Sequence, residues 1–538
     1  MGRIIDSCCS YNGQDEMDME RSNQNRMMQM QKRKNQYLME KNRFQDTINN
    51  CYDDMYTDHD FPADHKSILG TSQDASKMDD INRFCTEWLR ATDFPSADEY
   101  LPELFKDGIH PNDIKQGMLG DCYFVAALAS LAEWPHRVEK IFASTRANQK
   151  QVFGVHMYKD GIFQTIIVDN YFPVFNSQVN RVRKANGEEL GKEGEPIFAA
   201  AYGNELWVAI AEKAYAKAHH GYVIVAGGSC GPTLRDLTGA PAYTYIFDEG
   251  QYPEDLLDKI IEGEKRNYAM SAGTPGVDEG QYDDKGIVPG HAYSLLAART
   301  ITDKHGCQVS LVQMRNPWKE GEWTGRFSDN SDDWTDELRE LLNHYPSDDG
   351  IFWMTFEDMV VTFDQVDICK VDDNAKFSYM QIEESEAQFA FVKFTVDNYC
   401  DRLTTFAVTQ RGCRTEEAEG NYTFDLNSYT RKVDVGFLKV NNENLEWNDN
   451  SSWGGNYTTL TNGTKERSPY ALRDTYVEFP NFEPGTYYMY VKIHWNGKAS
   501  GRTFSVNCYG PHQVNFCDDQ SELYNQRDCM QACGIRRR

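Results

Sequence analysis

The sequence predicts an α+β protein in which a mixed core of two subdomains is followed by an antiparallel β-sandwich domain. At 538 residues the chain is too long for one domain. Residues 55–372 alternate helical and strand patterns, whereas residues 376–510 hold short alternating apolar runs separated by Gly, Asn and Pro turns. A composition that is 40% hydrophobic and 13% aromatic supplies enough apolar side chains for several cores.

The expected domain boundaries follow these changes of pattern. Residues 1–54 are rich in Met, Gln, Asn, Lys and Arg, cannot close a core alone, and are expected to form a mobile or partly helical extension. The mixed core divides into subdomains at about 55–222 and 223–372. Residues 511–538 form a basic tail with cysteines, and because they lack a paired C-x-x-C, a loose tail is favoured over a zinc site.

Two helices are expected in the first subdomain. Residues 122–132, CYFVAALASLA, are apolar almost all round, end before Pro135 and are entered from a glycine-containing turn at 117–120, which is typical of a buried helix. Residues 205–218, ELWVAIAEKAYAKA, are expected to form the second helix.

The charge of the chain excludes one class of partner and leaves others open. The net charge is −28, from 83 acidic and 55 basic residues, so the surface should repel nucleic acid. No secretory leader pattern opens the chain, and most of its fourteen cysteines are therefore expected as free thiols in the cytoplasm. No apolar run approaches the roughly 18 residues that span a bilayer.

The first nine residues, MGRIIDSCC, resemble a dual acylation signal. Gly2 would carry myristate and the pair Cys8 and Cys9 palmitate. The motif expects a hydroxyl residue where Asp6 stands, with Ser7 one place late, so an ordinary exposed terminus is the alternative. Because two acyl chains anchor stably and one only marginally, acylation would add a peripheral membrane location. The β-sandwich is a second expected route to a membrane surface.

Cys122 is the candidate nucleophile of the sequence. It opens the first expected helix, where the positive end of the helix dipole and backbone N–H groups lower a thiol pKa. Gln116 lies six residues upstream in QGMLGDC, and its side-chain amide could donate to an oxyanion beside the Cys122 N–H. Gly120 allows a substrate backbone to approach closely. Taken alone, a cysteine in this position is more often a packed core thiol.

His291 and Asn316 are the candidate partners of this thiol. Strands are expected at 292–298, directly after His291, and at 309–314, shortly before Asn316. The amide oxygen of Asn316 can accept the imidazole N–H and fix its tautomer. Trp318 could cover that hydrogen bond and exclude water. Each residue alone has a plainer explanation, a strand-start histidine or an Asn-Pro turn.

The words QGMLGDC, GHAYS and RNPWKEGEWTG together resemble the calpain family of cysteine proteases. The resemblance runs over about residues 60–370 and implies a papain-like core, a cysteine endopeptidase activity and protein substrates. It implies catalytic roles for the four residues above and places cleft residues at Gly120, Gly290 and Trp318. It is much weaker over 376–510, where it suggests a C2-like domain.

The resemblance also implies calcium (Ca²⁺) as a cofactor at two sites built from oxygen ligands, as a hard cation requires. The ligands implied for the first site are Lys106, Gly108, Asp113 and Glu212. Those implied for the second site are Glu322, Asp329, Ser347 and Asp349. Ile351 stands where the family has another acid, so weaker calcium binding is expected at the second site. Calcium would align Cys122 with the other half of the cleft.

The chain departs from conventional calpains in a second respect. It contains no D-x-[DN]-x-[DN]-G loop, so neither an EF-hand domain nor a small EF-hand subunit is implied. Three alternatives stay open: a catalytically silent scaffold of the same fold, a calcium-dependent membrane adaptor, and a transglutaminase. The last would be expected to carry Asp where Asn316 stands.

Overall fold

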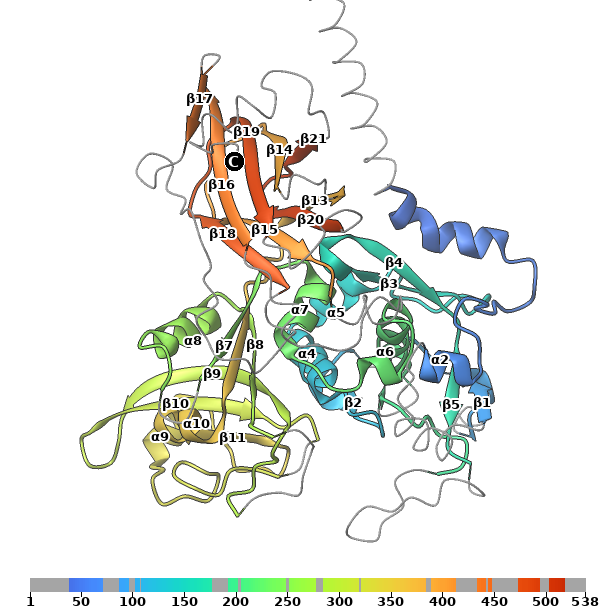
Figure 1. Cartoon of the computed structure of the whole chain (residues 1–538). Coiled ribbons are helices and arrows are strands. Elements are labelled where there is room, and N and C mark those ends of the chain that lie inside the picture. Colours follow the sequence, from blue (N-terminus) through green and yellow to red (C-terminus); the bar gives the residue numbers. More distant parts are fainter. Residues whose placement is uncertain are drawn as a thin grey trace, which may run out of the picture.

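The computed structural model describes a large part of the chain (Figure 1). The described residues are 38–70, 87–95, 102–106, 108–176, 192–201, 205–247, 251–276, 284–318, 321–383, 389–412, 433–441, 444–447, 473–493 and 503–517. Helices and antiparallel sheets occur together, so the predicted α+β class is confirmed.

The part that contains Cys122 is built around the buried helix α4. Every residue of α4 is buried, because its sequence is apolar on all faces. The predicted helix at 122–132 is therefore confirmed, and the second predicted helix begins two residues later than expected, at Trp207. The elements of this part are α2 (His65–Leu69), β1 (Glu87–Arg90), η1 (Ala91–Asp93), η3 (Pro111–Asp113), β2 (Ile114–Lys115), α4 (Cys122–Ala132), α5 (Pro135–Ile141), β3 (Phe153–Met157), η4 (Lys159–Gly161), β4 (Gln164–Val168), β5 (Tyr171–Val174), β6 (Ala200–Ala201), α6 (Trp207–Ala218) and η5 (Val223–Val225).

The part that contains His291 and Asn316 is a six-stranded sheet of order β11-β10-β9-β8-β12-β7, in which neighbouring strands are antiparallel. Figure 1 shows this sheet beside the α4 part, with α7 next to α4 and the upper sheets above. Its elements and the adjoining α7 are α7 (Cys230–Thr238), β7 (Ala242–Ile246), α8 (Leu256–Lys265), β8 (Ala269–Gly273), β9 (Ala292–Thr302), β10 (Gln308–Arg315), α9 (Asp336–Leu342), β11 (Ile351–Thr355), α10 (Phe356–Thr362) and β12 (Gln365–Cys369).

The two parts meet along α4. The Ser130 hydroxyl of α4 donates to the Met270 carbonyl of β8 at 3.0 Å. The Ser294 hydroxyl of β9 donates to the Ala126 carbonyl of α4 at 3.3 Å. These buried hydrogen bonds fix the helix that begins at Cys122 against the strand that follows His291.

The C-terminal strands form two antiparallel sheets whose inward side chains share one apolar core. The four-stranded sheet has the order β13-β20-β15-β18, and the five-stranded sheet has the order β17-β16-β19-β14-β21. Strand β21 pairs with β14, so residues 515–517, expected in a loose tail, instead continue the sheet. The strands are β13 (Lys376–Glu383), β14 (Phe389–Val396), β15 (Thr404–Gln410), β16 (Val433–Asn441), β17 (Asn444–Trp447), β18 (Asp474–Phe479), β19 (Gly485–Ile493), β20 (Thr503–Gly510) and β21 (Asn515–Cys517).

A buried group of charged side chains joins the C-terminal sheets to α7. Arg473, directly before β18, forms ion pairs with Asp236 of α7 at 2.7 Å and with Asp474 at 3.0 Å. Arg235 of α7 also pairs with Asp474, at 3.5 Å, and donates to Asn507 of β20. Since buried charges are held only where they are paired, this group fixes the C-terminal sheets against the end of α7.

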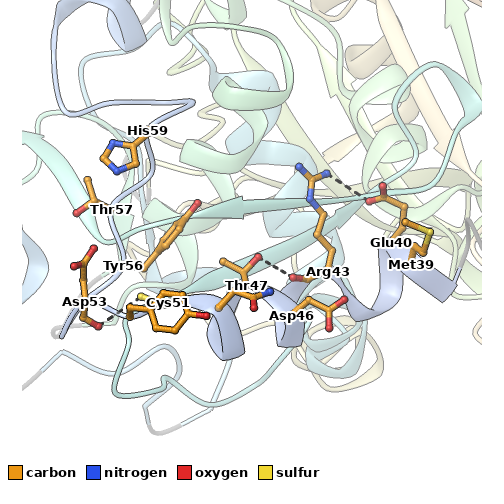
Figure 2. A pocket seen from close by; sticks show the side chains of 12 residues that line it. Met39, Glu40, Arg43, Asp46, Thr47, Cys51, Asp53, Tyr56, Thr57 and His59 are labelled. Atoms are coloured by element: carbon orange, nitrogen blue, oxygen red, sulfur yellow. Dashed lines mark hydrogen bonds and ion pairs between the residues drawn. The ribbon is translucent and has the colours of Figure 1, made fainter.

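Residues 38–50 form a helix that lies against the β3–β4 hairpin. Phe44 is buried there with Val152 and Ile167, and the Thr165 N–H donates to the Glu40 carboxylate at 3.0 Å. This portion of the expected mobile extension is thus a helix packed on the core. Figure 2 shows the cavity of about 790 Å³ between the helix and the loop that follows, with Cys51 among its lining residues.

No helix within the described ranges is both long enough and apolar enough to cross a membrane. The expectation of free thiols holds for the cysteines that the structure describes, which are Cys51, Cys122, Cys230, Cys307, Cys369, Cys400, Cys508 and Cys517. The remaining cysteines, including Cys8 and Cys9, lie outside the described residues, as does Gly2.

Candidate active site

Cys122 is the first residue of α4, and its side chain is nearly buried, at 9% exposure. Asp121 is the N-cap residue but makes no side-chain capping bond, so the first-turn N–H groups are not capped by it. A thiolate at this helix start is stabilised by the helix dipole. The Gly120 carbonyl accepts from the Gly227 N–H at 2.7 Å, which holds the turn before Cys122 against the loop that leads to α7.

His291 lies at the N-terminal end of β9, an inner strand of the six-stranded sheet, and is 2% exposed. Its backbone is held by a pair of bonds to Thr274, whose hydroxyl accepts from the His291 N–H at 2.9 Å and whose N–H donates to the His291 carbonyl at 3.0 Å. Gly290 has φ +64°, a conformation that glycine adopts without strain, and this bend brings the imidazole to the cleft.

Asn316 fixes the imidazole of His291. The Asn316 Oδ1 lies 3.0 Å from His291 Nε2 and also accepts from the Trp318 N–H at 3.1 Å. Its Nδ2 donates to the Gly321 carbonyl at 3.4 Å, which fixes the orientation of the amide. Since an amide oxygen only accepts, Nε2 carries the proton in this arrangement, and Nδ1 is the nitrogen that can take a proton from a thiol.

Cys122 and His291 line the same cavity, of about 220 Å³, although they are 169 residues apart in sequence and lie in different parts of the fold. Gly290 lines it too. A nucleophile and a base on one cavity, with the base oriented by a third group, are the arrangement that covalent catalysis needs. The larger cavity of Figure 2 is lined by none of these residues.

Trp318 links the two sides of the cleft. Its ring lies over His291, with 4.3 Å between the ring centroids, and its Nε1 donates to Gln116 Oε1 at 2.6 Å. The Gln116 Nε2 donates to the Leu119 carbonyl at 3.2 Å, so the amide nitrogen lies on the side of the turn that leads to Cys122. The structure thus brings together the four residues predicted for catalysis.

The ligands expected at the first calcium site are not brought together as a set. Glu212 is 2% exposed and accepts from the Ala199 N–H at 2.9 Å. Burial, and then the nearby Asp121 carboxylate, raise the pKa of Glu212 well above its usual value. Glu212 is the sixth residue of α6, whereas the Lys106 N–H is bonded to a different acid, Glu205.

Glu205, which the sequence analysis did not name, is the acid bonded to Lys106. It lies just before α6 and accepts from the Lys106 N–H at 2.7 Å and from Trp207 Nε1 at 2.9 Å. Glu205 and Glu212 are seven positions apart, and only Glu212 lies within α6. Asp113 accepts from the His110 N–H at 2.8 Å within the loop that contains Lys106 and Gly108. An acid at the start of a helix that faces this loop was the signal that could have identified Glu205.

The acids expected at the second site gather around the loop before β11. Glu322 accepts from the Asp349 and Gly350 N–H groups at 3.1 and 2.9 Å, and Asp329 accepts from the Ser347 N–H at 2.9 Å. Burial, and then the negative charge of Asp329, raise the pKa of Glu322 to about 7. Asp329 Oδ1 is buried without a hydrogen-bond partner. A cation bound here would balance the charge of these partly buried carboxylates.

Neither group is an assembled metal centre. Among the described residues no three His, Cys, Asp or Glu side chains lie close enough together to hold a metal ion. This absence concerns side chains alone, and backbone carbonyls are expected to supply the remaining ligands of each site.

Comparisons with known proteins agree with the family resemblance of the sequence motifs. The family model described as "Calpain family cysteine protease" matches residues 56–370. A calpain-type cysteine protease of Arabidopsis thaliana is 32% identical over 330 residues, which cover 59% of this chain and 14% of that protein. The catalytic subunit of calpain-1 from Homo sapiens is 32% identical over 303 residues, which cover 54% of this chain and 38% of that protein.

The chain therefore spans well under half the length of these relatives. Among solved structures, a clostridial cysteine protease matches with a TM-score of 0.16 and 13% identity, covering 49% of this chain and 59% of that one. A likeness this weak says nothing further about the site.

Proposed function

Because the chain belongs to the calpain family of cysteine proteases, we propose that it is a calcium-dependent cysteine endopeptidase that cleaves intracellular proteins. The observation that carries the proposal is the single cavity lined by Cys122 and His291, with Asn316 Oδ1 3.0 Å from His291 Nε2. The finer fold belongs to the same proposal: a papain-like core of two subdomains, with the cleft between them, followed by a C2-like β-sandwich.

In the proposed reaction, the Cys122 thiolate attacks the substrate carbonyl while His291 Nδ1 holds the thiol proton. The oxyanion is stabilised by the Cys122 N–H and the Gln116 amide. His291 then gives its proton to the leaving amine, and water hydrolyses the acyl-enzyme. Asn316 keeps Nε2 protonated throughout, and the Trp318 ring shields that hydrogen bond from water.

Replacing Trp318 with phenylalanine is expected to lower kcat/KM about fivefold. The substitution keeps a ring over His291 but removes the 2.6 Å hydrogen bond to Gln116, a loss of about 1 kcal/mol. The measurement is steady-state cleavage of a fluorogenic peptide at saturating calcium. Trp88→Phe on β1, away from the cleft, is the matched control and should change nothing. Unchanged kcat/KM in Trp318→Phe would show that the bond does not help to align the cleft.

Calcium would be held by carboxylates that lie on both sides of the cleft. Glu205 and Asp113 would serve the first site with the Lys106 and Gly108 carbonyls, and the acids that surround the loop before β11 would serve the second. Bound calcium would supply positive charge that lets these carboxylates pack closely. Each site lies beside a loop that leads into the cleft, and a misplacement of about 1 Å can cost a hundredfold in rate.

Glu205→Gln is expected to raise the calcium concentration for half-maximal activity about tenfold. The amide keeps the shape of the side chain but removes one ligand charge. Glu212→Gln, seven positions further along the chain in α6, is the matched control. Because the Glu212 carboxylate is buried against the Ala199 N–H and does not bond the Lys106 loop, the substitution should leave the calcium requirement unchanged. Equal calcium curves for Glu205→Gln and the wild type would remove Glu205 from the site.

The proposed setting is the cytoplasm, with peripheral membrane contact through Gly2, Cys8 and Cys9 or through the C-terminal sheets. The free thiols of the described residues support a reducing compartment. No small EF-hand subunit is part of the proposal.

The direct test of the proposed function is cleavage of a fluorescently labelled, unfolded protein. One sample contains about 5 mM calcium, which exceeds a dissociation constant of roughly 1 mM, and the other contains a chelator. Peptide products only in the presence of calcium are expected. No products under either condition would favour the silent scaffold, and equal products would remove the calcium dependence.

A further inference from the structure

A separate cavity lies between the two parts of the fold, at the end of α4 that is far from Cys122. Its volume is about 530 Å³, which is the size of many small-molecule sites. Ser130 of α4, with Glu133 and Trp134 just after the helix, lines one side, and β8, β9, β10, β11 and the end of α9 line the other. Because α4 is eleven residues long, its two ends are roughly 15 Å apart. We call this space the rear cavity.

The charged side chains that line the rear cavity form two ion pairs. Arg315 of β10 pairs with Glu133, and Arg299 of β9 pairs with Glu264 of α8. The two positive and two negative charges balance, so these residues give the rear cavity no net charge. Much of the remaining lining is apolar and includes Trp134, Met270, Leu295, Leu341, Leu342 and Ile351.

Two N–H donors on the rear cavity lack an acceptor. Trp353 Nε1 and Arg315 Nε are both buried, and within the part of the chain that the structure describes neither has a hydrogen-bond partner. The two residues are 2% and 6% exposed. Leaving a buried donor unsatisfied costs free energy, which an acceptor from a bound molecule would recover.

Both donors belong to the same face of the sheet. Gln313 of β10 lies directly opposite Trp353 of β11, and Arg315 lies opposite Ile351. Side chains opposite each other on paired strands, or two apart on one strand, share a face, so Gln313 lies beside both donors. Gln313 is only half-buried, and a change in its rotamer can let a bound molecule approach them. Such a molecule would be held by one donor from each strand.

The charge balance of the rear cavity decides which class of molecule fits. A carboxylate would place a second anion beside Glu133, which already pairs with Arg315, and would lose its own hydration. An ammonium group brings donors but no acceptor. An uncharged carbonyl accepts from the free N–H groups without adding charge, and an apolar body attached to it would be buried against the apolar lining.

We propose that the rear cavity is a binding site for an uncharged carbonyl compound with an apolar body, such as an amide, held by Arg315 Nε and Trp353 Nε1. The bound molecule would contact both parts of the fold. Arg315 directly precedes Asn316, which orients His291. Binding would therefore favour the arrangement in which Cys122 and His291 line one cavity. The site does not depend on the proposed protease function, because its test measures binding.

The test is a ligand-observed NMR titration of the full chain with three compounds of similar shape, phenylacetamide, phenylacetate and 2-phenylethylamine, at neutral pH. Phenylacetamide is expected to bind with a Kd at least about fivefold lower than that of either charged compound. Equal or tighter binding of a charged compound overturns the class of ligand. No saturable binding of any of the three overturns the site and leaves water as the partner of the two donors.

Two variants tie the binding to the rear cavity. Trp353→Phe keeps a ring but removes one donor and should raise the Kd of phenylacetamide about fivefold. Leu341→Gln changes a wall side chain that is 69% exposed, so the fold should be kept, and the Kd should rise about threefold.

Trp88→Phe and Val361→Gln are the matched controls, because neither residue lines the rear cavity, and both should keep the wild-type Kd. An unchanged Kd in both cavity variants, with unfolding temperatures like that of the wild type, would mean that phenylacetamide binds elsewhere, for example in the cleft at Cys122, and overturns the proposal. An equal rise in the controls overturns it as well.

Discussion

Cys122→Ala is expected to abolish protein cleavage, lowering turnover by about 10⁴-fold or more. Alanine keeps the helix start and the small volume of the side chain but removes the only atom that can form the acyl-enzyme. Residual turnover would come from His291 and the oxyanion donors acting on water alone. The measurement is release of fluorescent fragments from a labelled, unfolded protein at saturating calcium, with the unfolding temperature recorded to show that the variant is folded.

Cys307→Ala is the matched control for this substitution, because Cys307 is an exposed thiol in the turn between β9 and β10. It should cleave like the wild type. Normal turnover by Cys122→Ala would contradict the assignment of the nucleophile. Loss of turnover in Cys307→Ala would show that the effect of replacing a cysteine is not specific to Cys122.

Cys230 is a second thiol on the same cavity, and its environment argues against a nucleophilic role. It is 2% exposed, and its Sγ donates to the Tyr123 carbonyl at 3.2 Å. Burial, and then the charge of Asp367, raise the pKa of Cys230 far above its usual value, so it stays a neutral thiol. Cys230 begins a helix just as Cys122 does, so its burial and the charge of Asp367, and not its position, argue against it as the nucleophile.

Arg473→Met is expected to lower the free energy of unfolding by about 3–5 kcal/mol. The substitution keeps the length of the side chain but leaves the carboxylates of Asp236 and Asp474 buried without their 2.7 and 3.0 Å partner. Urea unfolding measures the loss. Arg266→Met is the control, because its pair with Glu262 is exposed on both sides, at 58% and 60%, and should contribute little.

The loss in Arg473→Met should be larger at pH 8 than at pH 5. Burial raises the pKa of Asp236 to about 6, against an unfolded value near 3.8, although Arg473 opposes the shift. A raised pKa in the folded state means that the folded protein binds the proton more tightly than the unfolded chain does. The contribution of protonated Asp236 to the free energy of unfolding is therefore present at low pH and lost as the pH rises through about 6. Without Arg473 the ionised Asp236 is costlier still. An equal loss at both pH values, or a loss below about 1 kcal/mol, would contradict the role given to this ion pair.

The sequence was most informative where the residues that carry the chemistry lie in short sequence motifs. The helix from Cys122 was predictable because its apolar run, its glycine turn and Pro135 all lie within twenty residues. The order Cys122, His291, Asn316 was predictable as chemistry, but only the fold brings the first two onto one cavity.

The sequence was least informative where partners are distant in the chain. Glu205 and Glu212 read alike in one amphipathic stretch, and the contact with Lys106, 99 residues away, distinguishes them. The ion pair between Arg473 and Asp236 joins residues 237 positions apart, and no sequence pattern in either segment predicts it. The helix at 38–50 was missed as a packed element because only two apolar residues of a polar sequence, Phe44 and Ile48, pack in its cluster.

The most direct test of the central claim is thiol labelling by an epoxide inhibitor or iodoacetamide, with calcium and with a chelator, mapped by mass spectrometry. The account predicts that calcium accelerates modification of Cys122 about tenfold or more, beyond the rate of the exposed Cys307, whose rate should not depend on calcium. Cys122 left unmodified while Cys307 reacts would contradict its role as the nucleophile. Equal modification of Cys122 with and without calcium would contradict calcium control of the cleft.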